Sequence, residues 1–484
     1  MIYPDYENFK KIKEKYEKIT IYKEVFADTF TPISFLMNYA TEDYIFLLES
    51  VNIDKTFSRF SFFGIKPAKI IYGVKDKTYV VKDNQKKEID LNIVDYLQIN
   101  YKKQPQFSSG EYGDFAGGLV GFFGYESMNF MNFLRKNVKM DSSIHSAFFE
   151  VNDFFVFDNF KNKLYLAKCI NNNDIEYFEA VENLKKFQIK INENANEYKS
   201  FEKIDFLPEY KKYEFIDRVK AIKNEIINGE AIQIVFSQKF SIDANINPIS
   251  FYRGLRKINP SPYMFFLKFK QNIITGSSPE THLKVKDSFA LLKPIAGTYP
   301  VERDIDKVKK RLLNDEKEMA EHLMLLDLAR NDLYQGCNID SVKVNKSFVT
   351  EVYSHVVHIV SEVTGKLAGN FSSFDLFLKT FPAGTVSGAP KVRAIELINE
   401  YENSVRGFYA GCVGYFGYNH DLDTCITIRS AHFSENSVVV RAGAGIVYDS
   451  IPENEFTEVN RKLKALFKAF EIIKEIEYTN VFVS

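Results

Sequence analysis

The chain has 484 residues, of which 45% are apolar and 26% are charged, a composition typical of globular proteins. Its 63 Lys and Arg residues balance 64 Asp and Glu residues, so the formal net charge is -1 and bulk electrostatics argues against a nucleic-acid or membrane-surface partner. No run reaches the roughly 20 apolar residues of a membrane span, and the N-terminus has no basic and then apolar leader. The four cysteines form no CxxC pair, which fits reduced thiols. We therefore expect a soluble cytoplasmic protein, long enough for two or three domain-sized units.

The N-terminal part of the chain contains short strand-like runs separated by loops. Residues 44–48, 70–74 and 164–169 are rich in the branched and aromatic side chains that strands favour. Between residues 188 and 210 the composition shifts to Asn, Glu and Lys with little apolar patterning. We therefore distinguish an N-terminal segment, residues 1–187, from a linker, residues 188–210.

The C-terminal part has clearer periodicity. Residues 213–228 carry apolar side chains at three-to-four spacing, which predicts an amphipathic helix. A long helix is predicted over residues 306–333, and a last one begins near Pro452, with Ser450 and Glu453 as a capping box. Composition and alternation predict strands at residues 232–237, 353–363, 410–418, 423–430 and 438–448. The mixture indicates an α/β chain, although periodicity alone does not give its topology.

Two Glu-x-x-Glu spacings are the clearest candidates for chemistry. Glu318 and Glu321 lie in the predicted long helix, and Glu455 and Glu458 lie in the last one. Residues three apart share a helix face, so each pair points in one direction. Carboxylates that converge on a site suit Mg²⁺, which prefers oxygen ligands. From spacing alone, two solvated helix faces are the commoner explanation, but apolar neighbours such as Val459 place the pairs beside core stripes.

Two glycine-rich runs, residues 381–391 and 441–445, would let a backbone approach a ligand closely and offer N–H groups to an anion. The first run does not match a Walker A loop, because only three residues separate its glycines. A carboxylate is therefore a simpler ligand than a nucleotide phosphate. A pair of tight turns would explain the glycines by themselves.

Arg429 and two histidines lie inside predicted strands. Arg429 would share a strand face with Cys425 and Thr427, and a cation there needs an anionic partner, either a structural carboxylate or a substrate. His355 and His358 would fall on opposite faces of their strand, so they cannot chelate one metal together, and a structural role is the default for each. The sequence contains no Gly-x-Ser-x-Gly elbow, zinc motif or glutaminase elbow.

Three segments in this order, residues 315–332, 381–391 and 441–458, together resemble the chorismate-utilising enzymes, most closely the anthranilate synthase component I family. The resemblance covers nearly the whole chain. It implies an α/β (α+β) fold, in which two β-sheets pack as a sandwich flanked by helices and form a single large body. The N-terminal segment contributes to that body, residues 211–470 form the chorismate-binding catalytic domain, and residues 471–484 form a C-terminal tail.

The resemblance also implies roles for individual residues. Mg²⁺ is the implied cofactor, with Glu321 and Glu458 as ligands and Glu455 beside them. Glu318 is the implied proton donor to the departing 4-hydroxyl of chorismate. The resemblance places His358 near that hydroxyl, so it replaces the structural role expected for His358. The structural role expected for His355 stays. The other implied contacts to chorismate, several of them to its enolpyruvyl carboxylate, are Thr385, Tyr409, Arg429, Gly443, Ala444 and Gly445.

Two positions separate the reactions within the family. Gln233 stands where isochorismate- and salicylate-forming relatives have a Lys that activates water, and an amide cannot act as that base. Ala296, followed by Gly297, stands where aminodeoxychorismate synthases typically have a Lys that can attack the ring. The resemblance therefore implies direct addition of ammonia at C2 and loss of pyruvate to give anthranilate, the first step of tryptophan synthesis. Aminodeoxychorismate synthase component I, of folate synthesis, is the alternative enzyme.

The resemblance further implies feedback control and a partner subunit. Residues 47–50 and 259–264 resemble the tryptophan-binding elements of the family, although an ordinary strand end and a Pro-rich turn would explain them in isolation. Because the glutaminase motif is missing, glutamine-dependent activity implies a separate amidotransferase that supplies ammonia. A tryptophan-sensing protein on an inactive scaffold is the non-enzyme alternative, against which the intact set of site residues speaks. The implied effector residues are Glu49, Ser50, Asn259, Pro262, Tyr263 and Met264.

Overall fold

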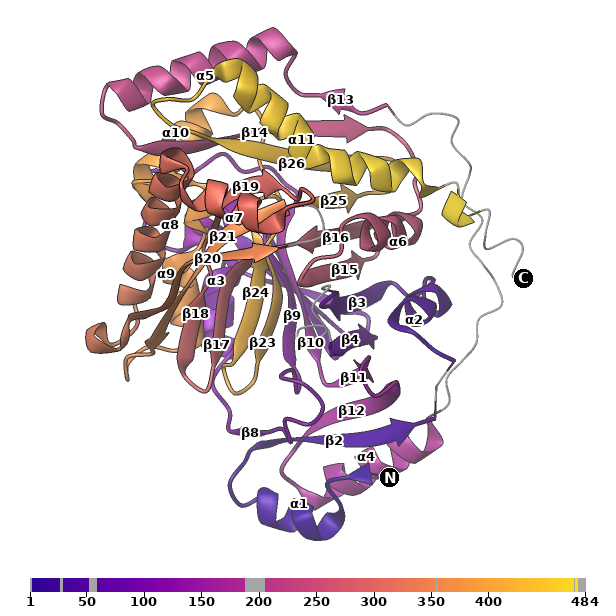
Figure 1. Ribbon diagram of the computed structural model, residues 1–484. Helices are drawn as coiled ribbons and strands as arrows, with labels where there is room; N and C mark the ends of the chain where they lie inside the picture. Colours follow the sequence, from indigo (N-terminus) through magenta and orange to yellow (C-terminus); the bar gives the residue numbers. More distant parts are fainter. Residues whose placement is uncertain are drawn as a thin grey trace.

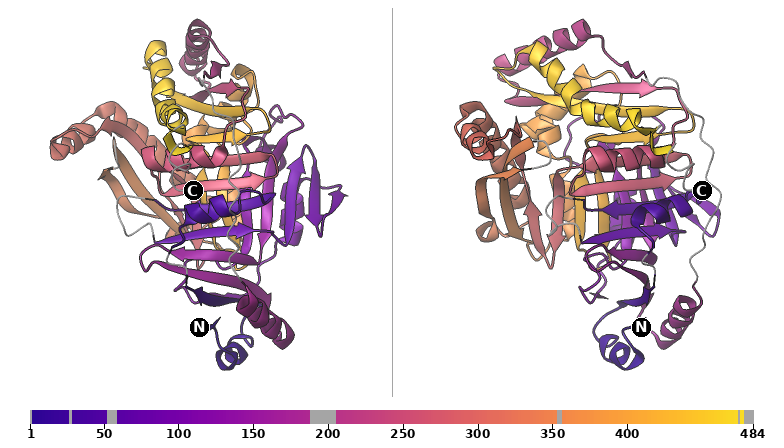
Figure 2. Two further views of the ribbon diagram at one scale, coloured as in Figure 1. Left: turned by 90° about the vertical axis from the view of Figure 1, so that its right-hand side faces the viewer. Right: turned by 45° about the vertical axis from the view of Figure 1, so that its right-hand side comes forward.

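Two large β-sheets, almost wholly antiparallel, pack against each other, and helices cover their outer sides (Figure 1, Figure 2). The arrangement, seen in a computed structural model, confirms the predicted sandwich flanked by helices. None of the described helices is both long and apolar enough to cross a membrane. The structure describes residues 2–26, 29–51, 59–187, 205–352, 356–473 and 475–477.

The first sheet contains strands from both ends of the chain. β3 (Tyr44–Glu49) of the N-terminal segment pairs with β15 (Tyr263–Phe269) of the catalytic region, so the sheet runs continuously from one to the other. In spatial order its strands are β1 (Ile2–Tyr3), β2 (Lys18–Val25), β12 (Lys163–Asn171), β11 (Asp153–Asp158), β4 (Phe60–Ile65), β3, β15, β16 (Asn272–Ser278), β25 (Ser430–Phe433), β26 (Val438–Ile446), β14 (Gln233–Ile242) and β13 (Leu207–Pro208), with β8 (Gln106–Phe107) beside β2 and β22 (Gly388–Ala389) beside β14.

The second sheet is shared in the same way. β9 (Gly118–Phe123) of the N-terminal segment pairs with β23 (Cys412–Gly417). In spatial order its strands are β19 (Ile295–Pro300), β21 (Val356–Lys366), β18 (Phe289–Leu292), β17 (Thr281–Lys286), β24 (Leu422–Ile426), β23, β9, β10 (Ile144–Val151), β5 (Lys69–Val74), β6 (Lys77–Lys82) and β7 (Gln85–Ile89), with β20 (Lys343–Val352) beside β21. The N-terminal segment is therefore part of the same folded body as the catalytic region.

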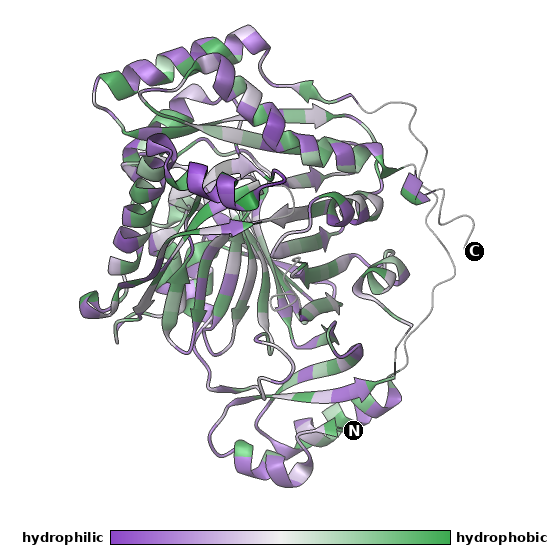
Figure 3. Ribbon diagram, viewed as in Figure 1, coloured by the Kyte–Doolittle hydropathy of each residue, from purple (hydrophilic) through white to green (hydrophobic). Residues whose placement is uncertain are grey.

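Amphipathic helices bury their apolar faces on the sheets. α5 (Lys212–Ile227) buries Phe215 and Val219, and hydrophilic and hydrophobic residues alternate along it (Figure 3). α10 (Lys391–Tyr401) and α11 (Pro452–Glu471) lie with α5 over the β14–β26 end of the first sheet, and α8 (Glu316–Tyr334) packs on β19 and β21 (Figure 1). The remaining helices are α1 (Tyr6–Ile12), α2 (Pro32–Asn38), α3 (Ile93–Asn100), α4 (Asp174–Lys186), α6 (Pro248–Ile258), α7 (Ile305–Leu313) and α9 (Ser373–Thr380), with short 3-10 helices η1 (Tyr125–Phe130), η2 (Ile339–Ser341) and η3 (Gly384–Val386).

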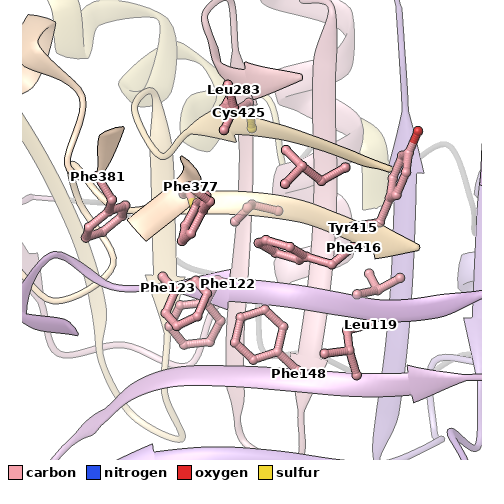
Figure 4. Close-up of a cluster of buried hydrophobic side chains, with 14 of the residues drawn as sticks. Leu119, Phe122, Phe123, Phe148, Leu283, Phe377, Phe381, Tyr415, Phe416 and Cys425 are labelled. Carbon is pink, nitrogen blue, oxygen red and sulfur yellow. The ribbon is translucent and has the colours of Figure 1, made fainter. Parts of the chain in front are cut away.

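Phenylalanine rings fill both faces of the second sheet. On the face toward the first sheet, Phe149 stacks on Phe269 with 4.1 Å between ring centroids. On the other face, Phe377 of α9 lies 5.2 Å from the rings of both Phe123 and Phe416 (Figure 4). Each such ring pair contributes about 0.5–1.5 kcal/mol beyond the area it buries. These two aromatic layers pack the sheets together and hold α9 on the second sheet.

Most predicted elements are confirmed, but the long helix is wrong. The structure has two helices where the sequence predicts one over residues 306–333, because α7 ends before Asn314 and Asp315 begins a new cap. The Asp315 carboxylate accepts hydrogen bonds from the backbone N–H groups of Lys317 and Glu318, each at 3.1 Å. An N-cap inside an otherwise periodic run restarts the helix in a new direction. The confirmed elements are β3, β5, β12, α5, β14, β21, β23, β26 and α11, β21 over the described part of its predicted range.

The strand predicted over residues 423–430 is also wrong at its C-terminal end. β24 stops at Ile426, and Arg429 adopts a left-handed φ of 51° in the bend before β25. Arg429 therefore does not share a strand face with Cys425 and Thr427. A left-handed non-glycine residue costs about 1–3 kcal/mol and persists where the surrounding structure imposes it.

Two further predictions concern chain ends and caps. The N-cap of α11 is Ile451, so the predicted capping box is wrong, and the Ser450 hydroxyl accepts a hydrogen bond from the Val447 N–H at 3.0 Å instead. His355 lies outside the described residues, as does most of the predicted linker. At the linker's end, β13 pairs with β14 and so belongs to the first sheet.

Candidate active site

The predicted site residues come from both sheets and from two helices. β14 and β26 carry Gln233 and the Gly443–Gly445 run, whereas β19 and β21 carry Gly297 and His358. α8 supplies one Glu-x-x-Glu pair and packs on β19 and β21, and α11 supplies the other and packs on β26. The fold therefore brings together segments that are far apart in the sequence.

Gly297 forms a β-bulge that joins two of the predicted catalytic residues. The register of β19 on β21 shifts between Ala296 and Thr298, and Gly297 has a φ of 67°. Its carbonyl accepts a hydrogen bond from His358 Nδ1 at 2.9 Å. A Cβ on Gly297 would lie 3.3 Å from Glu318 Oε2. His358 and Glu318 thus meet at the backbone of one glycine.

The His358 ring is neutral near pH 7, because burial lowers its pKa to about 4. The Gly297 carbonyl opposes this shift and the nearby Arg429 guanidinium adds to it. Because a carbonyl can only accept, Nδ1 carries the ring proton and Nε2 does not. His358 is therefore suited to accept a hydrogen bond at Nε2.

The carboxylates of α8 and α11 influence one another. Burial raises the pKa of Glu321, the Lys462 ammonium lowers it, and the Glu458 carboxylate raises it again. Burial and the charge of Glu458 also raise the pKa of Glu455. Lys462 Nζ lies 2.8 Å from Glu458 Oε1 and donates to the Gly443 carbonyl at 2.9 Å. Lys462 is a site residue that sequence analysis missed, although its spacing of four from Glu458 was a usable signal.

The donor set fits Mg²⁺. Glu321 and Glu458 present carboxylate oxygens from two helices to one region, where a cation would relieve their mutual repulsion. Among the described residues, no set of three or more His, Cys, Asp and Glu side chains could hold a metal ion by itself. A Mg²⁺ ion here would therefore need oxygens from water and substrate as well, as is usual for this ion.

The glycines of β26 leave room for two polar side chains. A Cβ on Gly445 would lie 2.5 Å from Gln233 Nε2, and a Cβ on Gly443 would lie 3.0 Å from the Tyr409 hydroxyl. Ala444, between them, is fully buried. Gln233 and Tyr409 therefore pack directly on the β26 backbone, and larger residues at the two glycines would displace them.

A small cleft borders the site at Thr385. It is lined by Thr385 and by Glu280, a buried residue directly before β17 that sequence analysis missed. Burial raises the pKa of Glu280 to about 7, against the opposing effects of the Thr385 hydroxyl and the Arg429 guanidinium. Among the predicted site residues, only Thr385 lines this cleft, and α8 contributes Leu325, Leu328, Ala329 and Asp332.

The residues predicted to bind tryptophan lie on neighbouring segments, but they do not all point the same way. Glu49 of β3 is paired in register with Met264 of β15. The Glu49 side chain is fully buried, accepts a hydrogen bond from the Tyr252 hydroxyl at 2.6 Å, and lies 3.3 Å from Arg256 Nε. Its carboxylate is thus already engaged by α6.

The other members of this set connect to the second sheet and to Arg429. The Tyr263 hydroxyl donates to Asp423 at 2.9 Å. The Asn259 side-chain amide donates to the Ser277 hydroxyl at 3.3 Å, and the Ser277 backbone N–H donates to the Arg429 carbonyl at 3.1 Å. The half-buried residues of the set are Ser50, Asn259, Pro262 and Tyr263.

Comparison with known proteins identifies the family. The family model of chorismate binding enzymes matches residues 49–468. Anthranilate synthase component 1 of Acetivibrio thermocellus is 36% identical, with 98% of this chain and 100% of that protein aligned, and the protein of the same name from Aquifex aeolicus (strain VF5) is 37% identical, with 97% and 98% aligned.

Solved structures give the same result. Anthranilate synthase component I from Streptococcus pneumoniae TIGR4 superposes with a TM-score of 0.73 at 33% identity, covering 86% of this chain and 94% of that one. The menaquinone-specific isochorismate synthase MenF from Escherichia coli shares the fold, with a TM-score of 0.69 at 18% identity. The chain therefore belongs to the family of chorismate-binding enzymes that includes anthranilate synthase component I.

Proposed function

We propose that this chain is the large subunit of an anthranilate synthase, which converts chorismate and ammonia to anthranilate and pyruvate with Mg²⁺. The observation that carries the proposal is the amide of Gln233, packed on Gly445 beside the Glu321 carboxyl. An amide cannot deprotonate water, whereas ammonia attacks without prior deprotonation. The identity to anthranilate synthase component 1 proteins supports the same reaction.

Chorismate binding follows from the charges in the site. The Arg429 guanidinium, the Tyr409 hydroxyl and the backbone N–H groups of Gly443–Gly445 receive the enolpyruvyl carboxylate. Glu321 and Glu458, with Glu455 beside them, hold Mg²⁺, which when bound supplies positive charge that orients the ring carboxylate. Lys462 neutralises part of the acidic cluster and ties Glu458 to the β26 backbone.

Departure of the 4-hydroxyl requires a proton. Glu318 is our assigned donor, because it lies beside the Gly297 bulge that also orients His358. Glu280 is the second candidate, since a pKa of about 7 leaves its carboxyl partly protonated at neutral pH. Substitution of each carboxyl in turn distinguishes the two.

Ala296 separates the proposal from aminodeoxychorismate synthase. The residue is buried in β19 and offers a methyl group instead of an amine. Without an amine to attack the ring, ammonia adds directly at C2 as the 4-hydroxyl departs. Elimination of pyruvate with loss of the C2 proton then forms the aromatic ring of anthranilate.

We also propose a partner and a feedback inhibitor. A separate glutamine amidotransferase supplies ammonia, and tryptophan binds near Ser50 and the Asn259–Met264 segment, which β3 and β15 bring together. The four cysteines are buried thiols without disulfide bonds, which supports a reducing, cytoplasmic setting.

One assay tests the function. The purified chain is mixed with chorismate, Mg²⁺ and excess ammonium, and anthranilate fluorescence and pyruvate are measured together. Both products are expected, and tryptophan is expected to suppress both. Consumption of chorismate without pyruvate would favour aminodeoxychorismate synthase, and no consumption would favour a tryptophan-sensing protein. Hydrolysis of glutamine by this chain alone would contradict the need for a partner.

A further inference from the structure

Arg406 lies at the centre of a buried ion network behind the substrate-contacting residues. Its side chain is 1% exposed, and Nε and Nη2 donate to the two carboxylate oxygens of Glu402 at 2.9 and 2.7 Å. Glu402 also accepts a hydrogen bond from Arg441 Nη1 at 3.0 Å. Two-pronged pairing of this kind fixes the plane of the guanidinium as well as its position.

The same guanidinium holds two segments of the candidate site. Arg406 Nη1 donates to the Val386 carbonyl and Nη2 to the Val235 carbonyl, each at 2.7 Å. Val386 follows Thr385 in η3, and Val235 lies two residues after Gln233 in β14. One rigid plane therefore sets the distance between the backbone segments that carry Thr385 and Gln233.

A third segment is held through the faces of the guanidinium. The carbon of the Arg406 guanidinium lies 5.7 Å from the ring centroid of Tyr409 and 4.6 Å from that of Tyr125. The Glu126 carboxylate accepts hydrogen bonds from the backbone N–H groups of Arg406 and Gly407, at 2.7 and 3.0 Å. The N-terminal segment thus fixes the loop that carries Tyr409.

We propose that Arg406 is a positioning residue that sets the mutual placement of Thr385, Gln233 and Tyr409, and thereby the geometry of the chorismate site. The inference rests on the proposed function, because it assumes that these three residues contact the substrate. Within the described part of the chain, the hydrogen bonds of the Arg406 side chain end on Glu402, Val235 and Val386, so the residue acts through its neighbours.

Arg406→Lys tests the proposal, with Arg441→Lys as its matched control. A compact ammonium keeps the charge but cannot reproduce the planar fork. Arg441 is equally buried in the same network, so both variants lose comparable ion pairs. The control leaves the contacts to η3 and to Tyr409 in place, because the Arg441 side chain bonds instead to Glu209, Ser237, Glu402, Ser404 and Val405.

Both variants are compared in three measurements. These are thermal unfolding, chorismate affinity by calorimetry without ammonia, and kcat and KM with ammonium. Misplaced site residues predict a kcat/KM for chorismate about 100-fold lower in Arg406→Lys, mostly through KM, at a Tm similar to that of Arg441→Lys. Equal kinetics of the two variants would overturn the inference alone. A wild-type chain that neither binds nor converts chorismate would overturn the proposed function and this inference with it.

A second pair of variants serves if Arg406→Lys does not fold. Tyr125→Leu removes the ring on one face of the guanidinium, whereas Tyr125→Phe keeps that ring and removes a hydroxyl for which no hydrogen-bond partner is found among the described residues. The Leu variant is expected to raise the KM for chorismate at least roughly fivefold over the Phe variant. The same KM in both would count against the inference.

Discussion

The Gly297 carbonyl accepts a hydrogen bond from His358 Nδ1 at 2.9 Å, and the glycine provides that carbonyl from a bulge with a φ of 67°. The bond fixes the tautomer of His358 and leaves Nε2 unprotonated. The lack of a Cβ also matters, because Glu318 Oε2 approaches to 3.3 Å from where that atom would be. The backbone conformation of Gly297 therefore decides how His358 and Glu318 are placed.

Gly297→Ala is expected to lower both stability and activity. Left-handed φ costs a non-glycine residue about 1–2 kcal/mol. The added methyl also lies 3.2 Å from Ile359 and Leu312 and 3.3 Å from Glu318, so the carboxyl must move. Small displacements of reacting groups reduce kcat by roughly tenfold or more. Thermal unfolding and steady-state kinetics measure the two effects.

Gly369→Ala is the control for that change. No atom lies within 4 Å of a Cβ at Gly369, and its φ is not left-handed, so both stability and kcat should stay near wild type. Full activity of Gly297→Ala would show that the bulge does not position His358 or Glu318.

Glu280→Gln tests which carboxyl protonates the leaving hydroxyl. A proton donor with a pKa of about 7 works below that pH, so if Glu280 is the donor, kcat falls as pH rises through about 7 at constant free ammonia. If Glu280 is the donor, Glu280→Gln loses roughly 100-fold or more in kcat and the alkaline fall disappears. If Glu318 is the donor, the large loss appears in Glu318→Gln instead. Kinetics from about pH 6 to about pH 9 distinguish the two.

Stability gives an independent check on Glu280. Its pKa is raised above the usual value of about 4.3, so the stabilisation from the protonated, buried carboxyl is present below about pH 4 and is lost as pH rises through about 7. Wild type should therefore lose more stability than Glu280→Gln between about pH 5 and about pH 8. Parallel stability curves would mean that Glu280 titrates at its ordinary pKa.

Sequence analysis predicted the features that depend on residues close together in the sequence and missed those that depend on segments far apart. The Glu-x-x-Glu pairs were found because spacing within one helix decides which side chains share a face. The break at Asp315 was missed because a single cap competed with a favourable apolar period over the same residues. Glu280 was missed because its unusual pKa arises from burial by segments remote in the sequence.

Sequence patterns could not predict the strand order or the role of Arg406, because both depend on contacts between segments far apart in the sequence. Composition identifies β3 as a strand, but its pairing with β15 joins segments that lie far apart in the sequence. In the sequence, Arg406 is likewise one charged residue among many. Its role becomes visible only from its contacts with β14, η3 and η1 in the folded chain.

Glu321→Gln and Glu458→Gln are expected to abolish the dependence on Mg²⁺. Removing one of two carboxylate ligands should lower turnover roughly 100-fold or more. Calorimetry with Mg²⁺ and chorismate, without ammonia, should show that the metal no longer strengthens chorismate binding. Stability should not fall in Glu321→Gln, because burial and the Glu458 charge already oppose ionisation of Glu321.

Glu316→Gln on the exposed side of the first turn of α8 is the control for the metal variants. It should bind Mg²⁺ as wild type does. Retention of Mg²⁺-dependent binding in both Glu321→Gln and Glu458→Gln would remove these residues from the metal site.

Tryptophan inhibition is expected to depend on Ser50 and to reach Arg429 through Ser277. Ser50→Phe should abolish inhibition with kcat within about twofold of wild type, because Ser50 lies beyond β3 and makes no described bond to the catalytic residues.

Ser277→Ala removes the hydroxyl that bonds Asn259 but keeps the backbone N–H that holds the Arg429 carbonyl, so it should weaken inhibition while chorismate still binds. Inhibition curves at several chorismate concentrations measure the coupling between the two ligands. Tryptophan must weaken chorismate binding by the same factor by which chorismate weakens tryptophan binding. Unchanged inhibition in Ser50→Phe would place the effector site elsewhere, and unchanged coupling in Ser277→Ala would exclude the route through Asn259.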